Sequence, residues 1–247
     1  MDFLKKIIQV GLFQYAGIFV ELITSILMIR YLGADDYGVY VIAFIIPRII
    51  ISVGSFGIGP AIIYYYNKIK IEISSLVITF SIIGMVLGSI YIVLGYASLE
   101  IIQDYFHRKV SNYLIITAMY LMPILLIQKY IRQTLRATYR IKEFAFILNI
   151  IPAITRLILT IYILVILNLG LYGIVWVPIV TQLFTTLIIF FVLRKDILSG
   201  IRNGFILVNS DVLKKIIIFG LKSHFGGAIQ KMNDQIAVGI MAGILSP

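Results

Sequence analysis

The sequence predicts an all-α protein, a polytopic bundle of about seven transmembrane helices. Of its 247 residues, 61% are hydrophobic and only 13% are charged. That charged share is about half the share of soluble domains, whose outer surface needs polar cover. The third observation is the length of the apolar segments, because a membrane-spanning helix needs about 20 such residues. Backbone groups in lipid must bond within their own segment, so we expect helices rather than open strands.

Six segments are long and apolar enough to span a bilayer, and a seventh is apolar but carries more polar residues. They are 7–31, 39–66, 71–97, 112–135, 144–168, 171–193 and, as the seventh, 216–242. The first resembles a signal peptide because Lys5 and Lys6 precede it. Its apolar run is too long, however, and has no small-x-small cleavage site. We therefore expect it to be a retained helix.

An internal repeat predicts one complete lobe and the start of a second. Leu-Lys-Lys-Ile-Ile followed by Gly-Leu occurs at 4–12 and again at 213–221. Six predicted spans separate the copies, so both begin on the same side of the membrane, as in a parallel repeat. We expect a six-helix lobe at 1–193, a cytoplasmic connector at 194–215 and the first helix of an incomplete second lobe at 216–247. The alternative is a coincidental repeat in a seven-helix protein.

The formal net charge of +10 allows three interpretations. They are nucleic-acid binding, the positive-inside bias of membrane proteins and an anionic substrate. Nucleic-acid binding is not expected, because it needs a dense cationic surface and the basic residues here are spread between apolar spans. The other two interpretations are compatible with each other.

The distribution of Lys and Arg between the predicted loops orients the chain. With a cytoplasmic N-terminus, the inner side holds Lys5, Lys6, Lys68, Lys70, Arg132, Arg136, Arg140, Lys142, Arg194, Lys195, Arg202, Lys214 and Lys215. The outer side then holds Arg30, Arg108 and Lys109. The positive-inside rule therefore predicts that the N-terminus is cytoplasmic.

Polar residues within the spans mark the candidate site, because an ionisable group in lipid is costly and usually faces a cavity or a partner. The first and seventh spans carry polar stripes in similar register, which we expect to face one central cavity. The predicted substrate-binding cations are Arg48, Arg156 and Lys231, and the predicted polar cavity residues are Gln14, Glu21, Asn149, Gln230 and Asp234.

Two interpretations stay open for each intramembrane arginine. The first is a buried ion pair, for instance with Glu21. The second is an anion site in an aqueous cavity. Two arginines suit a phosphate or pyrophosphate, because guanidinium groups bind such anions through paired, charge-assisted hydrogen bonds.

The residue types present do not predict an enzyme. The chain has no cysteine and two histidines, which excludes disulfides, thiolate metal sites and a histidine-based metal cluster. We find no phosphate-binding glycine loop, no HExxH motif and no plausible Ser-His-Asp set. No cofactor and no metal are expected.

Several short motifs resemble one family of membrane transporters. Segment 30–40 reads RYLGADDYGVY, 135–144 reads LRATYRIKEF and 169–173 reads LGLYG. Together with Gly220-Leu221 through Gly243, which resembles the family's seventh helix, they resemble the Wzx-like polysaccharide flippases of the MOP superfamily, along the whole chain. The LG…YG element of the first segment is the most specific part of this resemblance.

The resemblance implies a two-lobed, MATE-like transporter of the plasma (inner) membrane, of which this chain holds one lobe. Such proteins are thought to flip undecaprenyl-pyrophosphate-linked oligosaccharide units for surface polysaccharides such as O-antigen. The expected partners are this anionic lipid-linked oligosaccharide, membrane lipids and polysaccharide polymerases or glycosyltransferases. Cationic cavity residues would attract the pyrophosphate.

Two alternatives remain. A cation-coupled multidrug antiporter of the same superfamily would need acidic cavity residues, of which only Glu21 and Asp234 are available. A non-transporting scaffold or truncated membrane protein is the other.

Overall fold

The structure is a computed structural model that describes residues 2–105, 110–204 and 207–224. The described elements are all helical: α1 (Asp2–Leu32), α2 (Ala34–Gly54), α3 (Ile58–Ile69), α4 (Ile73–Ala97), α5 (Leu99–Tyr105), α6 (Asn112–Met119), α7 (Leu121–Ala137), α8 (Ile141–Ile161), a π-helical turn (Tyr162–Ile166), α9 (Gly170–Ile174) and α10 (Val177–Arg202). A further helix covers 210–224. The predicted all-α class is confirmed.

Six helical segments are long and apolar enough to cross a membrane. They are Ile8–Leu32, Ala34–Gly54, Ile73–Ala97, Asn112–Ala137, Phe144–Ile166 and Gly170–Arg202. These segments overlap the first six predicted spans, so the prediction of a polytopic helical membrane protein is confirmed. The second segment is shorter than predicted, because the helix expected at 39–66 is divided into α2 and α3.

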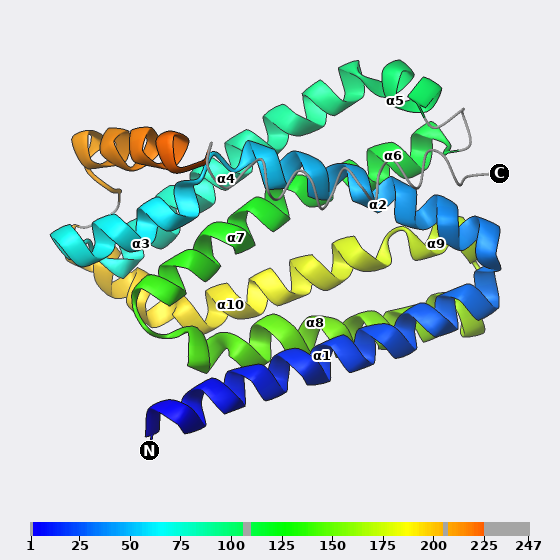
Figure 1. Ribbon diagram of the computed structural model, residues 1–247, viewed down its shortest axis with the longest axis horizontal. Helices are drawn as coiled ribbons and strands as arrows, with labels where there is room; N and C mark the ends of the chain where they lie inside the picture. Colours follow the sequence, from blue (N-terminus) through cyan, green and yellow to red (C-terminus); the bar gives the residue numbers. More distant parts are fainter. Residues whose placement is uncertain (1, 106–109, 205–206, 225–247) are drawn as a thin grey trace.

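The spanning helices lie side by side along the long axis of the molecule (Figure 1). α1 packs along α8, and α4 packs along α7. α10 contacts α4, α7 and α8, so it joins these two pairs. The largest buried cluster of apolar side chains draws on α2, α4, α6 and α7, with Phe80, Met122 and Tyr130 fully enclosed.

α1 buries little of its length and presents apolar side chains outward. Leu12, Tyr15 and Phe19 are 65%, 75% and 64% exposed. Its inner face approaches α8 closely, since a Cβ on Gly17 would lie 2.7 Å from the backbone oxygen of Asn149. In a bilayer the exposed apolar face contacts lipid, where it carries no hydrophobic penalty.

The break between α2 and α3 is held by side chains from two other helices. Phe56 and Gly57 have positive φ angles of 50° and 62°, which stop the helix. The freed carbonyls of Ile51 and Gly54 are then satisfied: Lys129 Nζ donates to Ile51 O at 3.2 Å, and the Tyr91 hydroxyl donates to Gly54 O at 2.6 Å. A broken helix is tolerated in a membrane where neighbours satisfy its freed backbone groups.

Replacing Tyr91 with phenylalanine tests this support. We expect the free energy of unfolding to fall by about 1–2 kcal/mol, because Gly54 O loses its donor. Tyr96→Phe is the matched control, since Tyr96 lies on the same helix and is 61% exposed. The measurement is the thermal unfolding of the purified chain in detergent. An equal effect of both changes would show that the Tyr91 hydroxyl does not support the break.

The 210–224 helix starts at the same end of the molecule as α1, on the left in Figure 1. It packs on the break between α2 and α3, since a Cβ on Gly57 would lie 2.3 Å from Gly220 O. α10 continues beyond residue 193 to Arg202 before the connection to this helix. The rest of the predicted seventh span, 225–242, lies outside the described residues.

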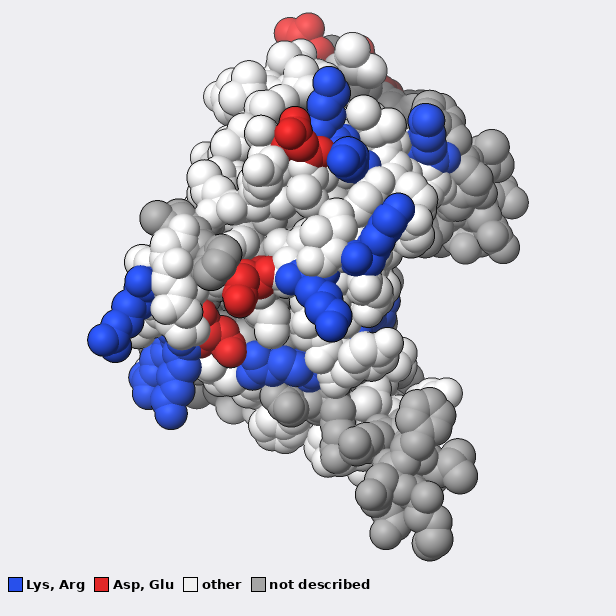
Figure 2. Space-filling model, turned by 90° about the vertical axis from the view of Figure 1, so that its left-hand side faces the viewer, with Lys and Arg blue, Asp and Glu red and all other residues white. Residues whose placement is uncertain are grey.

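Charged residues are divided unevenly between the two ends of the bundle. Figure 2 shows one end, where Lys and Arg side chains outnumber Asp and Glu. The described basic residues at this end include Lys68, Lys70, Arg136, Arg140, Arg194, Lys195, Arg202, Lys214 and Lys215. The opposite end carries Asp35, Asp36, Glu100 and Asp104 beside Arg30.

Candidate functional site

A polar pocket lies between five helices within the bundle. It has a volume of about 500 Å³, including its open mouth. Its lining residues are Glu21 from α1, Tyr40, Phe44, Pro47 and Arg48 from α2, Leu121 and Leu125 from α7, Arg156 from α8, and Pro178, Thr181 and Gln182 from α10. All of them belong to the candidate membrane spans, so the pocket lies at membrane depth.

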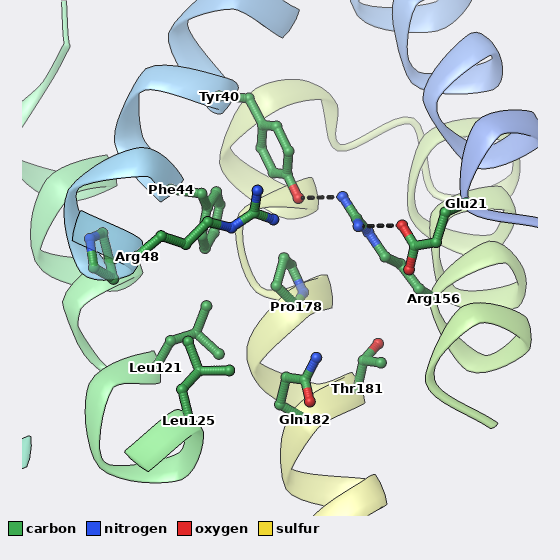
Figure 3. A pocket seen from close by; sticks show the side chains of 11 residues that line it. Glu21, Tyr40, Phe44, Arg48, Leu121, Leu125, Arg156, Pro178, Thr181 and Gln182 are labelled. Carbon is green, nitrogen blue, oxygen red and sulfur yellow. Dashed lines mark hydrogen bonds and ion pairs between the residues drawn. The ribbon is translucent and has the colours of Figure 1, made fainter. Parts of the chain in front are cut away.

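Arg156 is held on two sides. Its Nη1 pairs with Glu21 Oε2, and its Nη2 donates to the Tyr40 hydroxyl at 3.1 Å (Figure 3). The side chains of Arg156 and Glu21 are 17% and 37% exposed. Of the two interpretations for intramembrane arginines, the structure therefore gives Arg156 the ion pair with Glu21. Arg156 Nε is buried without a hydrogen-bond partner in the described part of the chain.

Tyr40 is fixed by aromatic packing and supports Arg156. It is 4% exposed and packs on Tyr37 and Phe44, with ring centroids 6.3 and 4.7 Å away. Its hydroxyl oxygen accepts from Arg156, which leaves its own proton available to another acceptor.

Arg48 differs from Arg156. It lies two turns after Tyr40 on the same face of α2, and its guanidinium points into the pocket toward the Tyr40 hydroxyl (Figure 3). Its side chain is exposed, and it makes no hydrogen bond or ion pair with the residues the structure describes. Glu21 is the only carboxylate among the lining residues, and Arg156 engages it. The described pocket thus carries a cation without a counter-ion.

α10 contributes uncharged polar groups to the pocket. Thr181 is 1% exposed, and its hydroxyl has no partner among the described residues. The Gln182 side chain points into the same space (Figure 3). Behind it, Gln128 Nε2 donates to Gln182 O at 3.0 Å and to Thr186 Oγ1 at 2.9 Å, which ties α7 to α10.

The structure brings together three of the residues predicted for the site: Glu21, Arg48 and Arg156. Gln14 is exposed and does not line the pocket. Asn149 donates to Ala145 O at 2.7 Å within its own helix and also lies outside the lining. The remaining three, Gln230, Lys231 and Asp234, lie outside the described residues.

Tyr40, Thr181 and Gln182 also line the pocket, and none of them was predicted from the sequence. Tyr40 could have been found, because it shares a face of α2 with Arg48 at a spacing of eight residues. Thr181 and Gln182 carry no comparable signal, because single threonines and glutamines are common in membrane helices. Among the described residues, no group of three or more His, Cys, Asp or Glu could hold a metal ion.

A family model described as polysaccharide biosynthesis protein matches residues 27–247. The chain belongs to the polysaccharide biosynthesis protein family. The match covers every lining residue of the pocket except Glu21. No curated protein and no solved structure matches the chain.

Membership of the polysaccharide biosynthesis protein family agrees with the architecture. The six apolar spans fit a multi-pass membrane protein, and together with the family they fit an interaction with lipids and lipid-linked sugars. The family description and the helical fold both favour a transporter-like protein over a catalytic one.

Proposed function

We propose that this chain forms part of a flippase that moves lipid-linked oligosaccharide units across the plasma membrane for surface polysaccharide synthesis. The substrate would be a polyprenyl pyrophosphate, such as undecaprenyl pyrophosphate, that carries a short glycan. The chain would supply a six-helix lobe at 1–193, a connector at 194–215 and the first helix of a second lobe. Polymerases and glycosyltransferases would be the neighbouring partners.

The observation that carries the proposal is Arg48, which lies in the pocket without a counter-ion among the described residues. An arginine at the centre of a membrane helix costs about 3 kcal/mol to insert. Arg156 offsets this cost through Glu21, but Arg48 has no carboxylate partner among the described residues. An anionic ligand would supply the missing charge and would gain strong, charge-assisted hydrogen bonds.

The charge balance of the pocket also distinguishes the proposal from a cation-coupled multidrug antiporter. A cationic drug would need a free carboxylate, and Glu21 is already paired with Arg156. Lipid-linked pyrophosphates, by contrast, carry negative charge, which would balance the positive charge of Arg48. The basic end of the bundle, which Figure 2 shows, supports an orientation with this end and the N-terminus in the cytoplasm.

Replacing Arg48 with methionine tests the proposal. In cells whose surface polysaccharide depends on this protein, we expect the amount of polysaccharide to fall at least about tenfold, because one charge-assisted contact is worth about 1.5–3 kcal/mol. The readout is surface polysaccharide per cell, with membrane insertion measured in parallel.

Arg194→Met is the matched control. Arg194 lies over the Phe191 ring, 3.9 Å from its centroid, near the basic end and away from the pocket. We expect it to leave the amount of polysaccharide unchanged. If Arg48→Met inserts normally and polysaccharide is also unchanged, the proposed anion site is wrong.

A further inference from the structure

The pocket has two chemically different sides. Arg48, Arg156 and Glu21 form the charged side, whereas Thr181 and Gln182 on α10 form an uncharged polar side, here called the neutral floor. Figure 3 shows both floor side chains directed toward the space below the two arginines. A purely anionic ligand would use the charged side and leave the neutral floor without a role.

The Thr181 hydroxyl differs from the hydroxyls of several other threonines in this bundle. Thr24, Thr185 and Thr186 each donate to the backbone oxygen four residues earlier, at 2.9, 2.8 and 2.7 Å. Such a bond is the ordinary way to satisfy a helical threonine. Thr181 lacks it, although the residue is only 1% exposed and borders the pocket.

The side chain of Gln182 also has polar groups that no described residue satisfies. Its backbone oxygen accepts from Gln128, which fixes the turn, but no hydrogen bond to a described residue engages its carboxamide. A carboxamide and a hydroxyl each donate and accept hydrogen bonds. Their natural complement is a ligand whose groups also do both, such as the hydroxyls of a sugar.

The remaining walls fit the same ligand. Phe44, Leu121, Leu125 and Pro178 line the space with hydrocarbon. A sugar ring presents C–H faces between its hydroxyl edges, so it can contact these walls and the neutral floor together.

We propose that Thr181 and Gln182 are specificity-determining residues that bind the hydroxyls of the sugar ring attached to the anionic group held by Arg48. The inference rests on the proposed function. It adds that the pocket recognises the sugar ring of the substrate as well as its anionic group. A site that hydrogen-bonds a ligand hydroxyl discriminates against an analogue without it, because its own polar groups are then left unpaired.

The test compares two probes of equal charge in lipid nanodiscs that contain the 247-residue chain. Both are farnesyl pyrophosphates whose terminal phosphate is capped, in one by a glucosyl group and in the other by a methyl group. We expect the chain to bind the glucosyl probe more tightly. Thr181→Val and Gln182→Leu should each weaken glucosyl-probe binding about 3- to 10-fold, the value of a single neutral hydrogen bond, and leave methyl-probe binding unchanged.

Thr160→Val is the control variant. Thr160 is also fully buried, and its hydroxyl has no partner in the part of the chain that the structure describes, but it does not line the pocket. It should change the binding of neither probe. This control separates ligand recognition from the general effect of removing an unsatisfied hydroxyl.

Arg48→Met separates failure of the inference from failure of the proposed function. It should weaken both probes. If it does so, and the two floor variants affect both probes equally or neither probe, the neutral floor does not bind sugar. If neither probe binds the wild-type chain, or if Arg48→Met changes neither affinity, the proposed function fails and the inference fails with it.

Discussion

Replacing Arg156 with methionine is expected to destabilise the folded chain by about 2–3 kcal/mol, because it leaves the Glu21 carboxylate without its ion-pair partner at membrane depth. This is below the usual cost of breaking a fully enclosed pair, about 3–5 kcal/mol, since the Glu21 side chain keeps 37% exposure. Glu21→Gln should also destabilise, because it leaves Arg156 with Tyr40 alone. Unfolding in mixed detergent–SDS micelles provides the measurement.

The double variant Glu21→Gln/Arg156→Met makes this prediction specific. Removing both charges should restore stability to within about 1 kcal/mol of the wild type, since replacing a buried ion pair by uncharged groups is often nearly neutral. A non-additive double-mutant cycle would therefore measure the coupling. Additive effects of the two single changes would contradict the ion pair as a structural link between α1 and α8.

Replacing Gly88 with alanine should disturb the close packing of α4 on α7. Gly84 and Gly88 lie one turn apart and face α7, where a Cβ on Gly88 would be 2.3 Å from Pro123 Cα. Backbone atoms cannot move aside as a side-chain tip can, so we expect destabilisation of about 1–3 kcal/mol or more. Small residues that allow such close approach are typical of packed membrane helices.

Gly11→Ala is the control for this change. A Cβ on Gly11 would meet no atom within 4 Å, outside its own helix. The substitution should be neutral or stabilising by up to about 1 kcal/mol, because alanine favours the helix more than glycine does. The measurement is the thermal unfolding of both variants in the same detergent, which compares their stabilities. Equal stability of the two variants would show that α4 and α7 do not depend on this close contact.

The spans could be predicted from the sequence because each depends only on its own hydropathy and length. The break at Ser55–Gly57 could not, because it depends on groups remote in the sequence. Ser55 Oγ binds Lys129 Nζ at 2.6 Å, and Tyr91 caps the end of α2. Hydropathy continues smoothly through 39–66, so the pattern alone predicts one uninterrupted helix where the structure has two.

The candidate site was predictable in its residue types but not in its pairing. Helical periodicity placed Glu21, Arg48 and Arg156 on cavity-facing surfaces, and it left the choice between ion pair and anion site open. That choice depends on which arginine α1 meets when it packs against α8. The structure pairs Arg156 and leaves Arg48 without a partner in its described part, a distinction that only the three-dimensional arrangement reveals.

The ion pair between Glu21 and Arg156 has a consequence for how the protein is made. The two residues are 135 positions apart, and α1 packs mainly on α8. At about 5–20 residues per second, the ribosome adds Arg156 roughly 7–27 seconds after Glu21. During that interval the Glu21 carboxylate has no Arg156 with which to pair. The first helix is therefore synthesised well before the fifth span supplies the partner of its carboxylate.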